Sequence, residues 1–277
     1  MADRPAVASR RDPDIKTALI HHKGDDLNGE GLALWLASFS ELIAVVAIEE
    51  PKSRLWKRIR REWRRSGPYR FLDVLAFRLY YRARLAATDR AWEAATLDRL
   101  RAAFPAPSPP ALLLTQSPNS AEVEAFLRDR APDLVIARCK SLLSKRIFTI
   151  PRHGTFVMHP GICPDYRNAH GCFWALAEGD DANVGMTLLR INEGIDTGPV
   201  FGHYRCEFDS LRDSHILIQN KVVIDNLESL RSKLIEIDEG VASPVNTTGR
   251  PTREWGQPWM SAYLRWRKRA RTRRRAL

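Results

Sequence analysis

A nearly continuous apolar run, Glu41-Leu-Ile-Ala-Val-Val-Ala-Ile48, constrains the fold of this chain more than any other feature. Strands with apolar residues on both faces are typical of parallel sheets that helices cover on both sides. The run follows a first apolar stretch, Ile15 to His21, a polar turn, and a segment from Leu27 to Phe39 with helical spacing of Leu, Trp and Ala. This strand–helix–strand order predicts an open, mostly parallel α/β sheet with helices on both faces.

The rest of the chain continues this alternation and completes the pattern of a Rossmann-like domain. Further strands are expected at residues 111–115, 132–137, 155–158, 186–191 and 200–206, and helices at 120–129, 213–237 and 259–275. We expect a flexible lead-in at residues 1–13, one α/β domain at 14–240 and a basic C-terminal extension at 241–277. Residues 51–104 look helical throughout and form an insert within the domain, followed by a stiff Pro-rich linker up to Pro110.

The formal net charge of +11 is unevenly placed. Eight basic residues and no acid lie between Arg265 and Arg275, and eight basic residues against one acid lie between Lys52 and Arg65. Such runs can bind phosphate backbones or anionic lipids, but a solvated tail and a solvated helix face are the favoured interpretation. Nucleic acid is therefore a partner that the Arg-rich tail permits and that we do not favour. A homodimer is equally compatible with the sequence.

The location of the protein is predicted from what the sequence lacks. No window approaches 18 consecutive apolar residues, and the N-terminus has no apolar core of a secretory signal. The four cysteines form no CxxC pair, which favours reduced thiols. We expect a cytoplasmic protein without a membrane span.

Two turns carry the residues best suited to chemistry. The first is His159-Pro-Gly-Ile-Cys-Pro-Asp-Tyr-Arg-Asn168, and the second is Glu193-Gly-Ile-Asp196-Thr-Gly-Pro199. Histidine titrates nearest neutrality, and a neighbouring aspartate can orient its ring and stabilise its protonated form. Such a pair moves protons at a reacting centre. The alternative is two structural turns, which Gly and Pro alone would explain.

Both turns resemble the signature of the formyltransferases that use 10-formyltetrahydrofolate, a family that includes glycinamide ribonucleotide, methionyl-tRNA and sugar N-formyltransferases. The family pattern Asn-x-His-Pro-Ser-Leu-Leu-Pro corresponds to Val157-Met-His159-Pro-Gly-Ile-Cys-Pro164, and Asp-x-Gly-x-Asp-Thr-Gly to the second turn. Pro132-Asp-Leu-Val-Ile-Ala137 resembles the strand that precedes the folate loop. The resemblance covers residues 110–205 and implies that 14–240 is the catalytic domain.

The resemblance also assigns roles to residues of this chain. It makes His159 the general acid/base and Asp196 its partner. Asn168, nearby in sequence, is a third catalytic candidate. The resemblance lays 10-formyltetrahydrofolate, as co-substrate, along two loops, and it gives the acceptor the turn after the first strand. The residues concerned are Cys139, Ser141, Leu142, Leu143, Asn192 and Ile195 for the folate, and Gly24, Asp25 and Asp26 for the acceptor.

One departure from the family pattern affects the chemistry. The family has an asparagine two residues before the histidine, where it donates a hydrogen bond to the oxyanion, and this chain has Val157. Losing one such donor typically costs roughly 100- to 1,000-fold in rate. Asn168, His170 and His153 are the nearby candidates for a substitute. No cysteine and histidine spacing fits a familiar zinc pattern, so no metal is expected.

The sequence therefore predicts transfer of a formyl group from 10-formyltetrahydrofolate to an amine of a small-molecule acceptor, as in glycinamide ribonucleotide formyltransferases. Two carboxylates, Asp25 and Asp26, stand in the turn that holds a phosphate in those relatives, which favours an acceptor without that phosphate. The alternatives are a hydrolase that releases formate from the folate, and a folate- or nucleic-acid-binding relative that has lost catalysis.

Overall fold

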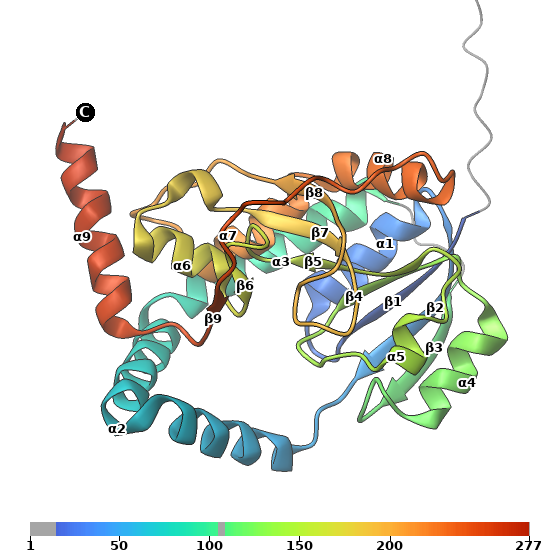
Figure 1. Ribbon diagram of the computed structural model, residues 1–277, viewed down its shortest axis with the longest axis horizontal. Coiled ribbons are helices and arrows are strands. Elements are labelled where there is room, and N and C mark those ends of the chain that lie inside the picture. Colours follow the sequence, from blue (N-terminus) through green and yellow to red (C-terminus); the bar gives the residue numbers. More distant parts are fainter. Residues whose placement is uncertain (1–14, 105–108, 277) are drawn as a thin grey trace, which may run out of the picture.

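The computed structural model describes residues 15–104 and 109–276, and its centre is a seven-stranded sheet in the order β3-β2-β1-β4-β5-β7-β8 (Figure 1). The strands from β3 to β5 run parallel, and β7 and β8 are antiparallel additions at one edge. This is the mostly parallel α/β sheet that the sequence predicted. The strands are β1 (Lys16–His22), β2 (Glu41–Ile48), β3 (Ala111–Thr115), β4 (Leu134–Arg138), β5 (Gly154–His159), β7 (Met186–Arg190) and β8 (Val200–Tyr204).

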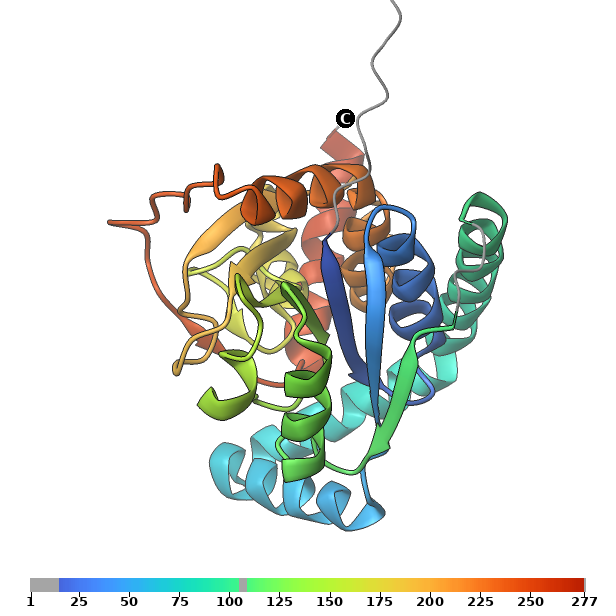
Figure 2. The ribbon, with the colours of Figure 1, turned by 90° about the vertical axis from the view of Figure 1, so that its right-hand side faces the viewer.

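Helices cover both faces of the sheet (Figure 2). One face packs against α1 (Leu32–Ala37), α3 (Ala86–Ala103), α7 (His215–Ile224) and α8 (Leu227–Asp238). The other face packs against α4 (Ala121–Arg130) and α5 (Lys145–Phe148). Strand β2 shows why its sequence is apolar throughout: Leu42 and Val45 join the first core, and Ala44, Val46 and Ile48 join the second.

The insert consists of α2 (Lys52–Arg84) and α3, which confirms the predicted helical segment. Helix α2 bends at Gly67, which has a φ of 72°, just before Pro68. Asp89 of α3 is 2% exposed and accepts hydrogen bonds from the Tyr81 hydroxyl and the Ser214 hydroxyl. Burial raises the pKa of this carboxyl. Asp89 therefore ties the two insert helices to the start of α7.

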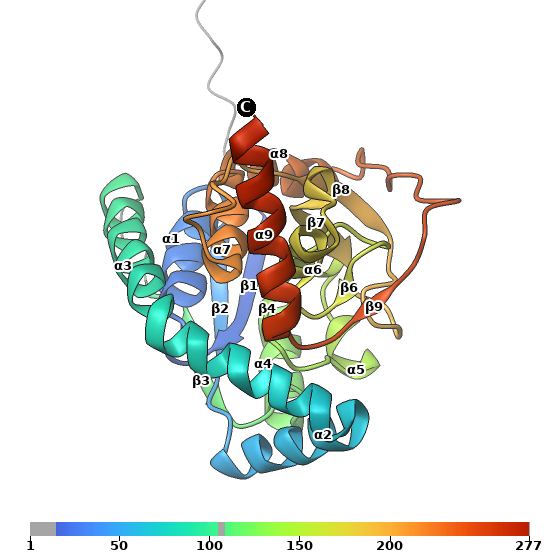
Figure 3. The ribbon, with the colours of Figure 1, turned by 90° about the vertical axis from the view of Figure 1, so that its left-hand side faces the viewer.

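The C-terminal segment wraps back onto the domain. Its short strand β9 (Glu254–Trp255) pairs with β6 (Arg167–Asn168), and α9 (Met260–Ala276) lies across α6 (Gly171–Glu178) and meets α2 (Figure 3). The Trp255 ring stacks on Tyr166 and on Trp174, with ring centroids 5.6 and 4.8 Å apart. The basic extension is thus packed against the loop that follows His159.

Two expectations about the helices are corrected. The single long helix predicted at 213–237 is divided into α7 and α8, because the Asn226 side-chain amide donates to the carbonyls of Val222 and Arg205 at the break. The first turn after β1 is the π-helix η1 (Leu27–Gly31) rather than an α-helix. The lead-in at 1–13 and most of the Pro-rich linker lie outside the described residues. None of the described helices is long and apolar enough to cross a bilayer.

Candidate active site

Strand β5 delivers His159 to the carboxyl edge of the parallel strands, where open α/β sheets bind their ligands. The His159 side chain is 4% exposed. Its Nε2 lies 2.8 Å from the Tyr166 carbonyl oxygen. Thr187 of β7 fixes the same loop, since its hydroxyl donates to the Gly161 carbonyl at 2.7 Å and accepts from the Cys163 amide at 2.9 Å.

The structure brings the two predicted turns together. Asp196 Oδ2 lies 3.3 Å from His159 Nδ1 and accepts the backbone N–H of Asn168 at 2.8 Å. Arg167 adds a second tie, donating from Nη1 to the Ile195 carbonyl at 2.9 Å. Asp196 and Asn168 both have a positive φ, of 51° and 77°. Non-glycine residues held in this region often mark functional sites.

The hydrogen bonds of His159 indicate its protonation pattern. A carbonyl oxygen only accepts, so Nε2 carries a proton toward Tyr166. Nδ1 then faces the carboxylate of Asp196, an arrangement that is favourable when Nδ1 is protonated as well. A proton on Nδ1 is therefore the one that His159 can pass to a ligand, and the Asp196 carboxylate stabilises the imidazolium that carries it.

Two glycines allow the loop to close this tightly. A Cβ on Gly161 would lie 2.4 Å from the Tyr166 carbonyl oxygen and 2.9 Å from His159 Nε2. A Cβ on Gly171 would lie 2.4 Å from the Gly161 Cα. No side chain fits at either position. The glycines of the Pro-Gly and His-Gly pairs therefore allow the loop to pack closely around His159.

The two loops predicted to hold the folate lie side by side at this edge. Lys145 forms an ion pair of 2.8 Å with Glu193 that connects them. Leu142 is 68% exposed and offers an apolar surface, whereas Leu143 packs against the core.

The polar groups of these loops mostly bond locally. Asn192 Oδ1 accepts from Gly194 and Thr197, Cys139 Sγ donates to the Ser141 carbonyl, and the Ser141 hydroxyl donates to Glu50. Burial raises the pKa of Cys139 to about 11, so this thiol is not a nucleophile at neutral pH. These side chains set the shape of the loops, and Leu142 remains exposed beside them.

The turn predicted to hold the acceptor points partly inward. Asp25 Oδ1 accepts from the backbone N–H of Asn28 at 3.2 Å and from its Nδ2 at 2.9 Å, while Asp26 makes no side-chain cap. Asn28 Oδ1 in turn accepts from Arg138 Nε at 2.9 Å. A chain of hydrogen bonds thus runs from the acceptor turn to the end of β4. Gly24, with a φ of 81°, lies exposed at the tip.

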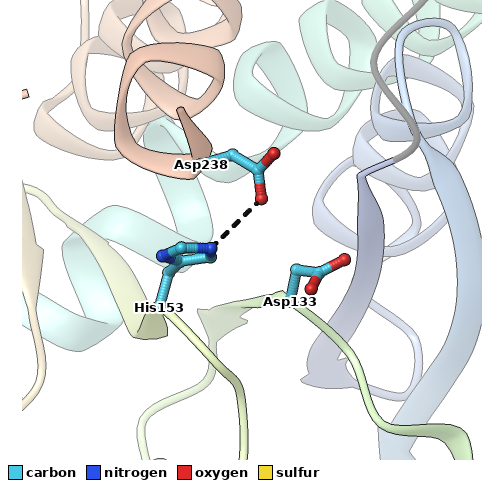
Figure 4. A group of neighbouring side chains, drawn as sticks. All are labelled: Asp133, His153 and Asp238. Carbon is cyan, nitrogen blue, oxygen red and sulfur yellow. Dashed lines mark ion pairs between the residues drawn. The ribbon is translucent and has the colours of Figure 1, made fainter. Parts of the chain in front are cut away.

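The three predicted substitutes for the missing asparagine have other contacts or lie elsewhere in the structure. Asn168 donates its side-chain amide to the Trp255 carbonyl at 2.8 Å, and the His170 ring lies 5.4 Å from the His215 ring. Burial, followed by the charges of Lys140 and Arg78, lowers the pKa of His170 to about 3, so this ring is neutral. His153 precedes β5 at the opposite edge of the sheet, 3.4 Å from Asp238 and near Asp133 (Figure 4).

Sequence reasoning missed Arg138 as a site residue. It lies at the carboxyl end of β4, and besides Asn28 its Nη1 donates to the Met158 carbonyl, immediately before His159. The sequence offered one indication, a single arginine at the end of the apolar strand Leu-Val-Ile-Ala-Arg138. An arginine in this position is ordinarily interpreted as the start of a solvated loop.

Comparison with known proteins relates the part of the chain that contains His159 and Asp196 to one protein family. Residues 96–231 match the family model described as formyl transferase. Methionyl-tRNA formyltransferase from Thermotoga neapolitana is 30% identical over 131 residues, which are 45% of this chain and 42% of that protein. The chain therefore aligns with less than half the length of this curated relative.

Solved structures agree on the fold. A sugar N-formyltransferase from a Shewanella species has a TM-score of 0.52 at 12% identity, covering 87% of this chain and 76% of that chain. A phosphoribosylglycinamide formyltransferase from Anaplasma phagocytophilum has a TM-score of 0.51 at 14% identity, covering 88% of this chain and 100% of that chain. At these identities the likeness concerns the fold.

Proposed function

We propose that this chain, whose residues 96–231 match the formyl transferase family, transfers a formyl group from 10-formyltetrahydrofolate to the amine of a small-molecule acceptor. The observation that carries the proposal is the contact between His159 and Asp196 at the carboxyl edge of the sheet, 3.3 Å apart. Two separate turns, each with backbone that Gly, Pro or a positive φ shapes, converge to make this pair.

The reaction includes two proton transfers that the pair can carry out. The neutral amine nitrogen attacks the formyl carbon, the formyl oxygen gains charge, and the bond from carbon to the folate nitrogen then breaks. The ammonium proton of the adduct must leave, and the folate nitrogen must gain a proton. His159 Nδ1 donates to the departing nitrogen, and Asp196 stabilises the charged ring and receives the proton lost by the amine.

The donor fits the loops of residues 139–143 and 192–196 by their surface. Leu142 supplies an exposed apolar side chain beside the Lys145–Glu193 connection, and a flat folate ring can pack on it while bonding to backbone groups. In this assignment the donor contributes the activated formyl group, and the protein contributes orientation and proton transfer.

A hydrolase that releases formate from the same donor is the second candidate. Val157 does not distinguish the two candidates, because a site with one oxyanion donor fewer is slow toward water and amines alike. Water needs no binding site of its own, so turnover without an added amine distinguishes this candidate from a transferase.

The test measures consumption of 10-formyltetrahydrofolate with and without a panel of amines, for the natural protein and for His159→Ala. We expect acceptor-dependent tetrahydrofolate formation that His159→Ala lowers at least roughly 100-fold while folate affinity stays within about threefold. His153→Ala is the matched control, because this histidine lies at the other edge of the sheet and should keep full turnover. Equal turnover in His159→Ala would remove His159 from the mechanism.

A further inference from the structure

Arg138 holds a charge that the protein does not neutralise. Its Nε donates to Asn28 Oδ1 and its Nη1 to the Met158 carbonyl, both uncharged acceptors. A guanidinium has five N–H groups, and these two bonds leave three of them without a partner among the described residues. Over the same residues, Arg138 forms no ion pair with a carboxylate. Arginine in a partly buried position normally pairs with an anion.

The surroundings of Arg138 make the missing partner costly. The side chain is partly buried, and desolvation lowers the pKa of the guanidinium. Among the described residues, Asp25 is the carboxylate whose charge acts on Arg138. The two side chains do not bond directly, because Asn28 lies between them and is hydrogen-bonded to both. A cation held between neutral dipoles, with donors to spare, is arranged to receive an anion from outside.

The acceptor turn cannot itself bind that anion through the amide of Asn28. The Asp25 carboxylate already takes this N–H and repels a second negative charge. The anion must therefore approach from the Arg138 side, between the turn after β1 and the end of β5, where the guanidinium bonds the residue before His159.

Two more cations border the same edge. Lys140 and Arg78, from the loop after β4 and from α2, are exposed, and both charges act on His170 in the loop that follows His159. Arg78 Nη2 donates to the neutral Gln257 side chain at 3.1 Å. Lys140 pairs through its backbone, donating its N–H to His22 Nε2. Neither forms an ion pair among the described residues.

We propose that Arg138 anchors the acceptor by binding an anionic group, a carboxylate or a phosphate, that the acceptor carries in addition to its amine. The spare N–H groups form a fork of the kind that binds such oxygens bidentately. The proposal deepens the proposed function by naming the acceptor class. In it, Asn28 and Asp25 are positioning residues that hold the guanidinium beside β5.

The test compares amines that differ only in the anion. Binding of phosphoethanolamine against ethanolamine, and of β-alanine against propylamine, is measured by calorimetry at physiological salt. We expect the natural protein to bind one charged member about tenfold or more tightly than its neutral counterpart. Preference in the phosphate pair alone indicates a phosphoester acceptor, and preference in the carboxylate pair indicates an amino acid-like acceptor.

Two variants locate the effect. Arg138→Met should abolish the preference, and Arg138→Lys should keep part of it, because lysine retains the charge and loses the fork. Arg128→Met is the matched control, since Arg128 is exposed on α4 and pairs with Glu124 at 3.0 Å. It removes the same net charge and should leave the preference unchanged.

The outcomes separate this proposal from the proposed function. Equal or absent binding of all four amines, or an unchanged preference in Arg138→Met, overturns the anion anchor whatever the turnover. A preference that depends on Arg138 in a protein that neither binds nor consumes 10-formyltetrahydrofolate supports the anion site and overturns the formyl transfer.

Discussion

Val157 is the residue at which this chain departs from the family pattern that its sequence resembles, and its surroundings show how the valine is packed. It is partly buried and packs against the cluster of Cys163, Leu189 and Val200. An apolar side chain here stabilises the junction of β5 with the antiparallel strands. It offers no hydrogen bond to a formyl oxygen.

Replacing Val157 with Asn should raise turnover of 10-formyltetrahydrofolate, because an amide at this position adds a donor for the oxyanion. We expect a gain of at least about tenfold in kcat with little change in KM, since the added bond forms only in the transition state. Steady-state kinetics of Val157→Asn and of the near-isosteric Val157→Thr measure it. Unchanged kcat in Val157→Asn would mean that another group already fills this role.

Residue-level prediction from sequence succeeded for His159 and Asp196 as neighbours, because turns rich in Gly and Pro fix where such side chains go. It did not foresee the bonds of Asn168 to Trp255 or of Arg138 to Asn28. Those partners lie 87 and 110 residues apart, and no local pattern records contacts at that separation. Asp25 and Asp26 look alike in sequence, and only the path of η1 decides that Asp25 bonds to Asn28.

At the scale of elements, the short strand β9 supports the loop that follows His159, through the contacts of Trp255. Trp255 lies between Tyr166 and Trp174, and its indole N–H donates to the Asp165 carbonyl at 3.1 Å. The carbonyl of Tyr166 is the one that orients His159. The loop that follows His159 is therefore supported by a residue of the C-terminal segment.

Trp255→Ala should destabilise the protein by about 2–3 kcal/mol, because it removes two stacked rings and one hydrogen bond from a partly buried position. Turnover should fall as well, since Tyr166 loses its support. Urea unfolding gives the free energy, and donor consumption gives the rate. Trp63→Ala is the control: this ring is 48% exposed on α2, and its loss should cost less than about 1 kcal/mol. Equal effects of the two substitutions would contradict the role of β9.

The elements themselves were largely predictable, and the exceptions have physical causes. Strand β2 was found at its observed bounds because apolar residues fill both of its faces. The break between α7 and α8 was missed because Val222 to Leu230 keeps helical spacing, while a side-chain amide captures the carbonyls. Strands as short as β6 and β9 arise from pairing between distant segments, which leaves no periodicity to detect.

For the whole molecule, the question is whether the C-terminal segment is an appendage, as its charge suggests, or part of the core. Helix α9 buries Ala262, Tyr263, Trp266 and Ala270 against α6 and α2, and most of its basic residues are exposed. Arg269 donates to the Ala177 carbonyl, and Arg273 pairs with Asp181. Trp266 is 1% exposed. One helix thus combines a core face with a strongly positive outer face.

Removing residues 241–277 should therefore prevent cooperative folding. Tyr263 and Trp266 would leave together with Trp255, at about 3–5 kcal/mol for each of the two buried rings, against a typical total stability of about 5–15 kcal/mol. Removing only residues 271–277 should shift the melting temperature by no more than a few degrees, because residues 271–276 are exposed and Arg273–Asp181 is a surface pair. Circular dichroism melts and size-exclusion chromatography of both truncations decide between the two interpretations.

If residues 1–240 melted cooperatively near the melting temperature of the full chain, α9 would be an appendage that the fold does not need. If the prediction holds, the basic residues lie on an element that the fold requires, and the positive face has a fixed position beside α6 and α2.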